Sequence, residues 1–283
     1  MAEELKVQEF FDKDTSTLSY IIYDSVTRDG VIVDSVLNYH PEDQSISYES
    51  IEMLLDFINS NKLKIHYILD THIHADHFTG AALLKESLPS SQTGIGDLDE
   101  TSRSYFKEKF PHFNDLPYDL LLKENEVLSA GSVNIEVLKT PGHTASCVSY
   151  KIGENIFTGD VIFIPDSGTG RCDFPGGDSE EMYHSIKGKL YSLPDHYNIY
   201  VGHDYSPNNR EMKFKTTVKD ELDHNTHLNK DIDVDKFVSM RSSRDKTLNS
   251  PRLLNESIYV NINGGDIRPM LIDNKKSIIK LEL

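Results

Sequence analysis

Short runs of β-branched and aromatic residues alternate with longer segments of helical periodicity through the first 205 residues. The runs predict strands at Thr17–Tyr23, Gly30–Val33, Lys64–Leu69, Val133–Leu138, Cys147–Ile152, Asn155–Phe157 and Asn198–Val201. Apolar residues spaced three and four apart predict helices at Tyr48–Asn59, Thr79–Leu88, Glu100–Lys109 and Ser179–Ser192. This alternation of strands and helices indicates an α/β fold built from layers.

The pattern changes after residue 205. Arg210–Leu228 and Val234–Lys246 are polar with helical spacing, and Ser257–Leu283 is predicted to form short strands around the turn at Asn263-Gly264-Gly265. We therefore expect a main domain over residues 1–205 and a C-terminal appendage over residues 206–283 that packs on the same domain.

The chain of 283 residues has 29 basic and 46 acidic residues, and its net charge of −17 opposes binding to nucleic acid or to an anionic membrane. An anionic small molecule would need a local basic pocket. The two cysteines, Cys147 and Cys172, are too few for a disulfide framework and fit a reducing compartment. No signal peptide is visible, and no apolar stretch approaches the roughly 20 residues that cross a bilayer. We expect a cytoplasmic protein; a homodimer is compatible with the sequence, which leaves the oligomeric state open.

The strongest chemical signal is the heptapeptide THIHADH, residues Thr71–His77, directly after a predicted strand. Its ligand-type side chains are His72, His74, Asp76 and His77. Imidazole and carboxylate groups are common ligands of transition metals, and a loop at a strand end can turn such side chains toward one or two cations. The alternative is a polar surface loop that is rich in histidine by chance.

Three further ligand-type residues each follow a predicted strand and a glycine. They are His143 in PGHT, Asp160 in TGD and His203 in GHD. Glycine before such a residue allows a sharp turn or a close backbone approach, and loops at strand ends commonly carry function. Each motif alone is typical of an ordinary turn, but the four motifs in this order predict a metal site.

The order HxHxDH, PGHT, TGD and GHD over residues 15–205 resembles the metallo-β-lactamase superfamily. The resemblance implies a four-layer αβ/βα sandwich with metal between the two sheet edges, and residues 1–205 would be its catalytic domain. It implies a first metal position at His72, His74 and His143 and a second at Asp76, His77 and His203. Asp160 would be the ligand shared by both positions.

Within this superfamily, the segment from Thr158 to Pro194, which contains GRCDF, and the segment IYVGHDY resemble persulfide dioxygenases. That family binds one iron(II) through two histidines and one aspartate, and oxidises glutathione persulfide to sulfite and glutathione with dioxygen. The resemblance implies His72, His143 and Asp160 as the iron ligands. Two imidazoles and one carboxylate on one face leave positions for sulfur and dioxygen. Zinc has no accessible redox change, so zinc in the same fold would support hydrolysis.

Arg171 and Tyr205 match positions that contact the glutathione part of the substrate in these dioxygenases. A guanidinium suits a carboxylate, and a phenol can donate to one. The alternatives are a structural salt bridge from Arg171 to Asp173 or Asp178, and a purely packing role for Tyr205.

The main alternative function is a thioester hydrolase of the glyoxalase II kind with one or two zinc ions, because all seven ligand positions it needs are present. The GRCDF segment, and the lack of an evident basic glutathione motif in the C-terminal helices, favour the dioxygenase. A non-catalytic persulfide sensor would be expected to have lost a ligand. The sequence therefore predicts a metal-dependent enzyme that acts on a glutathione-linked small molecule.

Overall fold

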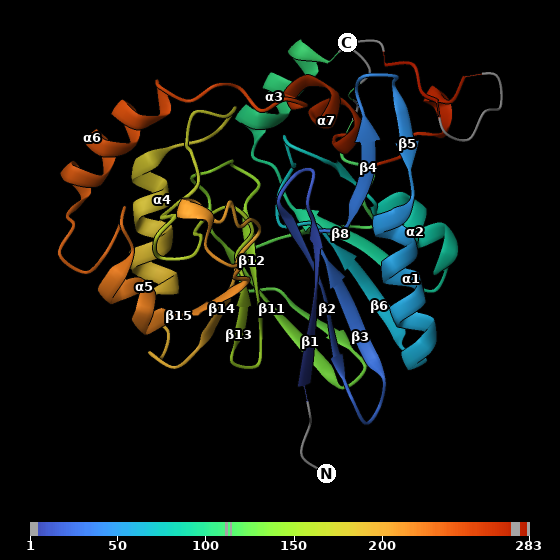
Figure 1. Cartoon of the computed structure of the whole chain (residues 1–283), viewed down its shortest axis with the longest axis horizontal. Helices are drawn as coiled ribbons and strands as arrows, with labels where there is room; N and C mark the ends of the chain where they lie inside the picture. The colour runs from blue at the N-terminus through green and yellow to red at the C-terminus, as the bar shows by residue number, and fades with distance from the viewer. Residues whose placement is uncertain (1–4, 111–112, 114, 273–277, 282–283) are drawn as a thin grey trace.

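The computed structural model describes residues 5–110, 113, 115–272 and 278–281. Two six-stranded sheets lie in the middle of the molecule, and helices cover the outer face of each sheet (Figure 1). This arrangement confirms the predicted four-layer αβ/βα sandwich.

The first sheet has the strand order β1-β2-β3-β6-β8-β9. Its strands are β1 (Leu5–Asp12), β2 (Thr17–Asp24), β3 (Asp29–Val33), β6 (Lys64–Leu69), β8 (Gln92–Gly96) and β9 (Leu120–Leu122). β1, β2 and β3 are antiparallel, whereas β3, β6, β8 and β9 run parallel. The parallel pairs need helical crossovers, which α1 (Glu49–Asn61), α2 (Ala81–Ser87) and α3 (Glu100–Lys109) supply.

The second sheet has the order β10-β11-β12-β13-β14-β15. Its strands are β10 (Val127–Ala130), β11 (Val133–Lys139), β12 (Val148–Ile152), β13 (Asn155–Phe157), β14 (Asn198–Tyr200) and β15 (Lys215–Thr217). β13 and β14 are parallel, and the connection between them contains α4 (Ser179–Ser185) and the π-helical turn η1 (Ile186–Leu190). A small third sheet has the order β5-β4-β7, with β4 (Val36–His40), β5 (Ser45–Ser47) and β7 (Phe78–Thr79).

The remaining helices follow β14 in the chain. They are η2 (Pro207–Asn209), α5 (Val218–His224), α6 (Val234–Asp245), α7 (Leu254–Asn261) and η3 (Arg268–Met270). α6 packs beside α4 on the outer side of the second sheet, whereas α7 lies near β4 and α3 (Figure 1). No helix in the described part of the chain is long and apolar enough to span a bilayer.

The alternating residues of β2 explain how the layers are held together. Leu18, Tyr20 and Ile22 join the core shared with the second sheet, whereas Ile21 joins the core under α1. Tyr20 packs edge-on against Phe157 of β13 with ring centroids 5.2 Å apart. Alternation of period two therefore supplies apolar side chains to both faces of a strand that is buried on both sides.

The strands and helices predicted in the first 205 residues are observed, with ends within two residues of the prediction. Two expectations for the appendage are wrong. Residues 257–261 belong to helix α7 and not to a strand, because Ile258 and Asn261 are buried on one helical face and this packing overrides the preference of β-branched residues for strands. Within the helix predicted at Arg210–Leu228, residues 215–217 pair with β14, and α5 begins only after its N-cap Thr217.

Part of the predicted extended tail is present. Isolated bridges pair Leu271 with Ile279 and Ser45 with Ile278. Residues 273–277 and 282–283, which belong to the same predicted segment, lie outside the described residues.

Candidate metal centre

Loops that carry ligand-type side chains meet at one rim of the sandwich. Asp34 follows β3, the loop Thr71–His77 follows β6, His143 follows β11, Asp160 follows β13 and His203 follows β14. Backbone hydrogen bonds join the two sheets here, from Leu18 N to Gly202 O at 2.8 Å and from Val148 N to Thr71 O at 2.9 Å. These hydrogen bonds fix the loops of the two sheets relative to one another.

His72, His143 and Asp160 form a buried group at this rim. Oδ2 of Asp160 lies 4.0 Å from Nε2 of His72 and 3.7 Å from Nε2 of His143. One ligand atom from each residue lies within 4.8 Å of the others. The structure therefore brings together the three residues that the resemblance implies as iron ligands.

The other carboxylate oxygen of Asp160 faces a second group. Oδ1 of Asp160 and Oδ2 of Asp76 each lie 3.3 Å from Nε2 of His203. Asp76 also forms a group with His74 and His77, again with ligand atoms within 4.8 Å. Because Asp160 presents one oxygen to each side, the arrangement offers ligands for one cation or for two.

The buried polar atoms of the rim test whether a cation fits. Nε2 of His72, Nδ1 of His74, Nε2 of His77 and Oδ1 of Asp160 are buried without a hydrogen-bond partner among the described residues. A buried polar atom without a hydrogen-bond partner lowers the free energy of unfolding by about 1–3 kcal/mol. A cation that accepts the lone pair of that atom removes this cost. Nitrogen and oxygen donors of this kind suit a transition metal ion, so the residues present fit one.

Three of the imidazoles use Nδ1 for a hydrogen bond to a backbone carbonyl. The acceptors are Arg171 O for His143 at 2.8 Å, Phe78 O for His77 at 3.0 Å and Ser16 O for His203 at 3.1 Å. A proton held on Nδ1 leaves the lone pair of Nε2 available, so these bonds select the tautomer that can bind a metal.

His74 differs from these three histidines, because Asp34 binds its Nε2 and not its Nδ1. Nε2 of His74 lies 3.1 Å from Oδ1 of Asp34, and Asp34 also accepts hydrogen bonds from the backbone and side chain of Thr71 at 2.7 and 2.9 Å. His74 therefore presents Nδ1 to the rim. Burial alone would lower the pKa of His74, but the Asp34 carboxylate raises it to about 9, so a proton and a metal ion compete for this ring.

The pKa shifts of His72 and His77 favour metal binding, whereas the carboxylates of Asp160 and Asp76 outweigh burial and raise the pKa of His203. Burial lowers the pKa of His72 well below its ordinary value and lowers the pKa of His77 to about 4. Burial raises the pKa of the Asp160 carboxyl, since a buried carboxylate without a cation is poorly solvated. His72 and His77 are thus neutral at pH 7 and need not lose a proton before they bind a metal.

Two glycines of the motifs are required by close contacts. Gly142, before His143, has φ +139° and packs against Met182 of α4, where a Cβ would lie 2.3 Å from the Met182 Cβ. At Gly202, before His203, a Cβ would lie 2.7 Å from Oδ1 of Asp160. A larger residue at Gly202 would displace the carboxylate from its position between the two groups.

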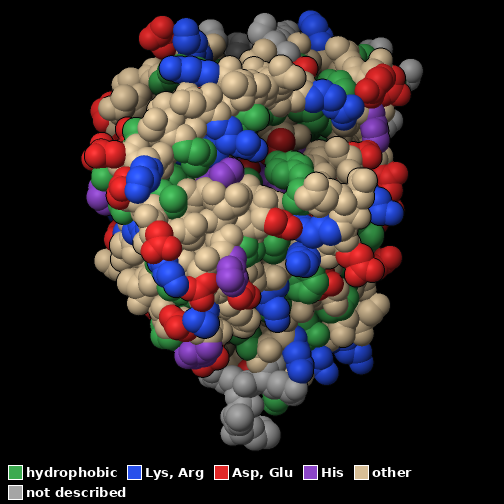
Figure 2. All heavy atoms as spheres, turned by 60° about the vertical axis from the view of Figure 1, so that its left-hand side comes forward, with side chains coloured by type: hydrophobic (Ala, Val, Ile, Leu, Met, Phe, Trp, Pro, Cys, Tyr) green, Lys and Arg blue, Asp and Glu red, His purple; other side chains and the backbone are tan. Residues whose placement is uncertain are grey.

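A cavity of about 570 Å³ opens beside the metal centre, and His143, Asp76 and Asp160 line it. Its apolar lining consists of Phe163, Phe174, Leu248, Pro251 and Leu253, and its basic lining of Arg171, Arg241, Arg244 and Arg252. Six of these nine residues lie within residues 241–253 of the appendage. Figure 2 shows acidic and basic side chains interspersed over the face drawn there, whereas the cavity gathers four arginines in a chain of net charge −17.

Arg171 and Tyr205 both line this cavity, as the resemblance implies. Nε and Nη2 of Arg171 bind Asp173 at 2.6 and 2.7 Å, and Nη1 donates to Asn249 O at 2.7 Å. The salt bridge to Asp173 considered as an alternative is therefore present. Tyr205 is 58% exposed, and its ring stacks on His203 with centroids 5.5 Å apart.

Two residues that support the metal loop were missed by the sequence reasoning. Asp34 could have been found, because it is a carboxylate directly after a predicted strand. Asn261 donates to His74 O and His77 O, both at 2.8 Å, and accepts from Thr79 N at 2.8 Å. No local pattern marks Asn261, because its partners lie more than 180 residues away in the chain.

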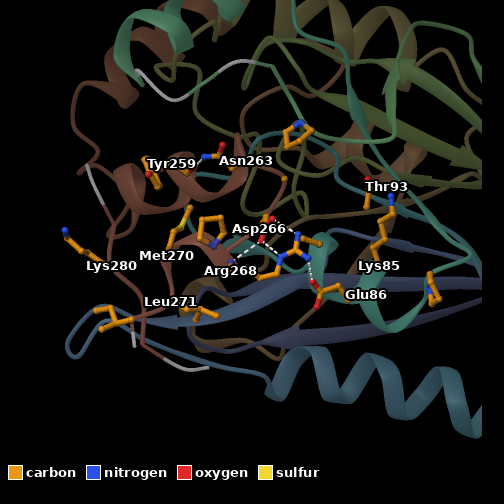
Figure 3. A pocket seen from close by; sticks show the side chains of 16 residues that line it. Lys85, Glu86, Thr93, Tyr259, Asn263, Asp266, Arg268, Met270, Leu271 and Lys280 are labelled. Carbon is orange, nitrogen blue, oxygen red and sulfur yellow. Dashed lines mark hydrogen bonds and ion pairs between the residues drawn. The ribbon is translucent and has the colours of Figure 1, made fainter. Parts of the chain in front are cut away.

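A larger cavity of about 1110 Å³ lies elsewhere, between α2 and the C-terminal segment. There Arg268 pairs with Glu86 and Asp266, and these residues project toward one another (Figure 3). Lys85, also in its wall, pairs with Asp119. None of the potential metal-binding groups found among the described residues lines this cavity, so its size does not make it the candidate site.

The family model of the metallo-beta-lactamase superfamily matches residues 13–203 of the chain. The chain therefore belongs to the metallo-β-lactamase superfamily and is an enzyme of that superfamily. The match covers the strands and loops that form the metal centre.

Relatives of the chain carry names that point to different reactions. Glyoxylase B2 of Dictyostelium discoideum is 39% identical over 289 residues, which cover 100% of this chain and 98% of the relative. The human mitochondrial persulfide dioxygenase ETHE1 is 30% identical over 201 residues, which cover 70% of this chain and 68% of the relative. The crystal structure of ETHE1 from Myxococcus xanthus has a TM-score of 0.75 and 26% identity, with 92% of this chain and 99% of that chain covered. These likenesses establish the family and not the reaction.

Proposed function

We propose that this chain is a non-haem iron(II) persulfide dioxygenase that oxidises glutathione persulfide to sulfite and glutathione with dioxygen. The observation that carries the proposal is the group of His72, His143 and Asp160 beside the cavity. Two imidazoles and one carboxylate on one side of a cation leave its remaining positions for substrate sulfur and dioxygen. The likeness to the human and Myxococcus xanthus proteins supports the same assignment.

Iron(II), when bound, would supply the transfer of electrons from sulfur to dioxygen that zinc cannot supply. Nε2 of His72, Nε2 of His143 and a carboxylate oxygen of Asp160 would hold the ion. The carbonyl of Arg171 keeps the His143 ring turned toward it. The ring of Phe174 meets that of His143 edge-on, with centroids 5.1 Å apart, and supplies an apolar wall beside this ligand.

The lining of the cavity supports a glutathione-linked substrate. Glutathione carries two carboxylates, and a chain of net charge −17 can bind such an anion only where basic groups are gathered. In the cavity wall Arg244 has no ion pair with a described residue and supplies that positive charge, whereas Arg171, Arg241 and Arg252 are each paired with a carboxylate. The apolar wall beside them suits the carbon chain of the thiol carrier.

A dinuclear thioester hydrolase of the glyoxalase II kind is the second candidate. It is favoured by the group of Asp76, Asp160 and His203, which offers ligands for a further cation, and by the 39% identity to Glyoxylase B2. Two zinc ions would supply Lewis-acid hydrolysis in place of oxidation.

Metal analysis combined with two assays tests the proposal. Protein purified without added metal should contain about one iron per chain and take up dioxygen with glutathione persulfide. Zinc in the protein, together with cleavage of S-D-lactoylglutathione and no uptake of dioxygen, would overturn the proposal in favour of the hydrolase.

A matched pair of variants tests the number of metal positions. His77→Ala and His143→Ala each remove one buried imidazole. With a single iron held by His72, His143 and Asp160, His143→Ala loses iron and dioxygen uptake, whereas His77→Ala keeps most of both. Equal loss in the two variants would indicate that the second group is required.

A further inference from the structure

His227, in the loop between α5 and α6, is held rigidly in the wall of the cavity. Nδ1 of His227 accepts a hydrogen bond from Thr169 N at 2.9 Å. The ring packs on Gly168, which has φ +85° and where a Cβ would lie 2.1 Å from Nδ1. The main chain before Thr169 therefore fixes both the position of the ring and the role of Nδ1 as an acceptor.

The loop that carries His227 is itself built on a buried residue. Oδ1 of Asn225 accepts hydrogen bonds from His227 N and Leu228 N, each at 2.9 Å. Nδ2 of Asn225 donates to Glu221 at 2.6 Å and to Gly168 O at 3.1 Å. Asn225 thus ties the His227 loop to the same glycine on which the His227 ring rests.

These contacts determine the protonation state of His227. An Nδ1 that accepts from an amide has no proton, so the ring is neutral and carries its proton on Nε2. Burial, assisted by the nearby guanidinium groups of Arg241 and Arg244, lowers the pKa of His227 to about 4. Nε2–H has no hydrogen-bond partner among the described residues, and His227 is only partly buried. The ring therefore has a free donor at neutral pH.

Arg244 differs from the other arginines of the cavity. Arg171 pairs with Asp173, Arg241 with Asp245 and Arg252 with Glu42. Arg244 is exposed and has no ion pair with any residue that the structure describes. Its guanidinium is thus available to an anion from outside the protein.

We propose that His227 and Arg244 form a carboxylate-binding subsite for the thiol carrier of the substrate. The inference rests on the proposed function and adds to it which residues select the carrier. A guanidinium and a fixed neutral N–H donor together suit a carboxylate, which accepts several hydrogen bonds and carries the opposite charge. Arg171, which the resemblance implies for this role, is already bound to Asp173 and Asn249.

Binding of the inert analogue S-methylglutathione, measured by calorimetry, tests the subsite without any turnover. Arg244→Gln should weaken binding by about 10-fold or more, and His227→Leu by about 2- to 10-fold, the ranges for a charged and a neutral hydrogen bond. His227→Gln can keep both an acceptor for Thr169 N and a donor, and should restore part of the loss. Lys236→Gln is the matched control, because it removes one positive charge from the same helix but from outside the cavity.

The diethyl ester of S-methylglutathione shows whether a carboxylate is recognised. The parent protein should bind the ester at least about 10-fold more weakly than the acid, and the two variants should bind the ester as well as the parent does. Equal weakening of acid and ester by Arg244→Gln, or a parent protein that binds neither, would overturn the subsite. Dioxygen uptake with glutathione persulfide is measured separately, so its absence would contradict the proposed function and leave the binding result to stand.

Discussion

The side-chain amide of Asn261 donates a hydrogen bond to the backbone carbonyl of His77 at 2.8 Å. The same amide group donates to His74 O, and its oxygen accepts from Thr79 N. One buried side chain at the end of α7 therefore holds the middle and the C-terminal end of the loop that carries four candidate metal ligands. The appendage takes part in the structure of the metal centre, although the boundary at residue 205 stays a prediction.

We expect Asn261→Ala to destabilise the protein and weaken its metal binding. The change leaves two buried carbonyls and one buried N–H without their partner, which corresponds to about 2–4 kcal/mol in the free energy of unfolding. Urea unfolding of the metal-free protein measures the first effect, and titration with Co(II), followed by its visible absorption, measures the second.

Asn263→Ala is the control for this change. Among the described residues, Nδ2 of Asn263 donates only to Tyr259 O within the same segment, at 2.7 Å. Its removal should leave Co(II) affinity unchanged. If Asn261→Ala bound Co(II) as tightly as the parent, the loop would not depend on this contact.

The contrast between Asp160 and Asn261 illustrates what a sequence can predict. Asp160 stands in a short motif just after the strand Asn155–Phe157, so both its element and its chemistry are encoded locally. Asn261 lies in a segment that resembles a strand, and its burial and role depend on packing and on three hydrogen bonds to residues far away in the chain. For the same reason the layered fold and the ligand groups were predictable, whereas the cavity wall formed by His227, Arg244 and Leu253 was not.

Asp160→Ala should abolish metal-dependent turnover and reduce the bound metal to well below one ion per chain. The carboxylate stands between the two groups of imidazoles, with Oδ2 3.7 Å from His143 and Oδ1 3.3 Å from His203. Elemental analysis after dialysis measures the metal. Asp195→Ala, an exposed position before β14, should retain it. Full activity in Asp160→Ala would reject Asp160 as a ligand.

Asp245→Asn should destabilise the protein strongly, because it leaves the buried guanidinium of Arg241 without its counter-charge. Arg241 and Asp245 form an ion pair inside the protein, and Asp245 also accepts from Cys172 N at 2.9 Å. Breaking a buried pair from one side costs about 3–5 kcal/mol. Urea unfolding gives the value.

The double variant Arg241→Met/Asp245→Leu distinguishes charge from packing. Removing both charges together should cost less than Asp245→Asn alone, since no unpaired charge remains buried. Asp223→Asn, which weakens the surface ion pairs with the exposed Lys219 and Lys230, should change stability less than Asp245→Asn. If the losses of unfolding free energy in Arg241→Met and Asp245→Leu added up to the loss in the double variant, the two residues would not be coupled.

Glu221 should make the protein less stable as the pH rises. This residue of α5 is buried and accepts from Asn225 at 2.6 Å, and burial raises its pKa well above the ordinary value of 4.5. Above pH 4.5 the unfolded chain has released the proton of Glu221, whereas the folded chain still holds it. The folded state therefore binds more protons and loses stability with increasing pH.

Glu221→Gln resembles the protonated carboxyl and cannot ionise. We expect the variant to match the parent near pH 4 and to exceed its free energy of unfolding at pH 8 by about 1 kcal/mol or more. Urea unfolding at both pH values measures this difference, with the exposed Glu108→Gln as control, and parallel pH profiles for parent and Glu221→Gln would contradict it.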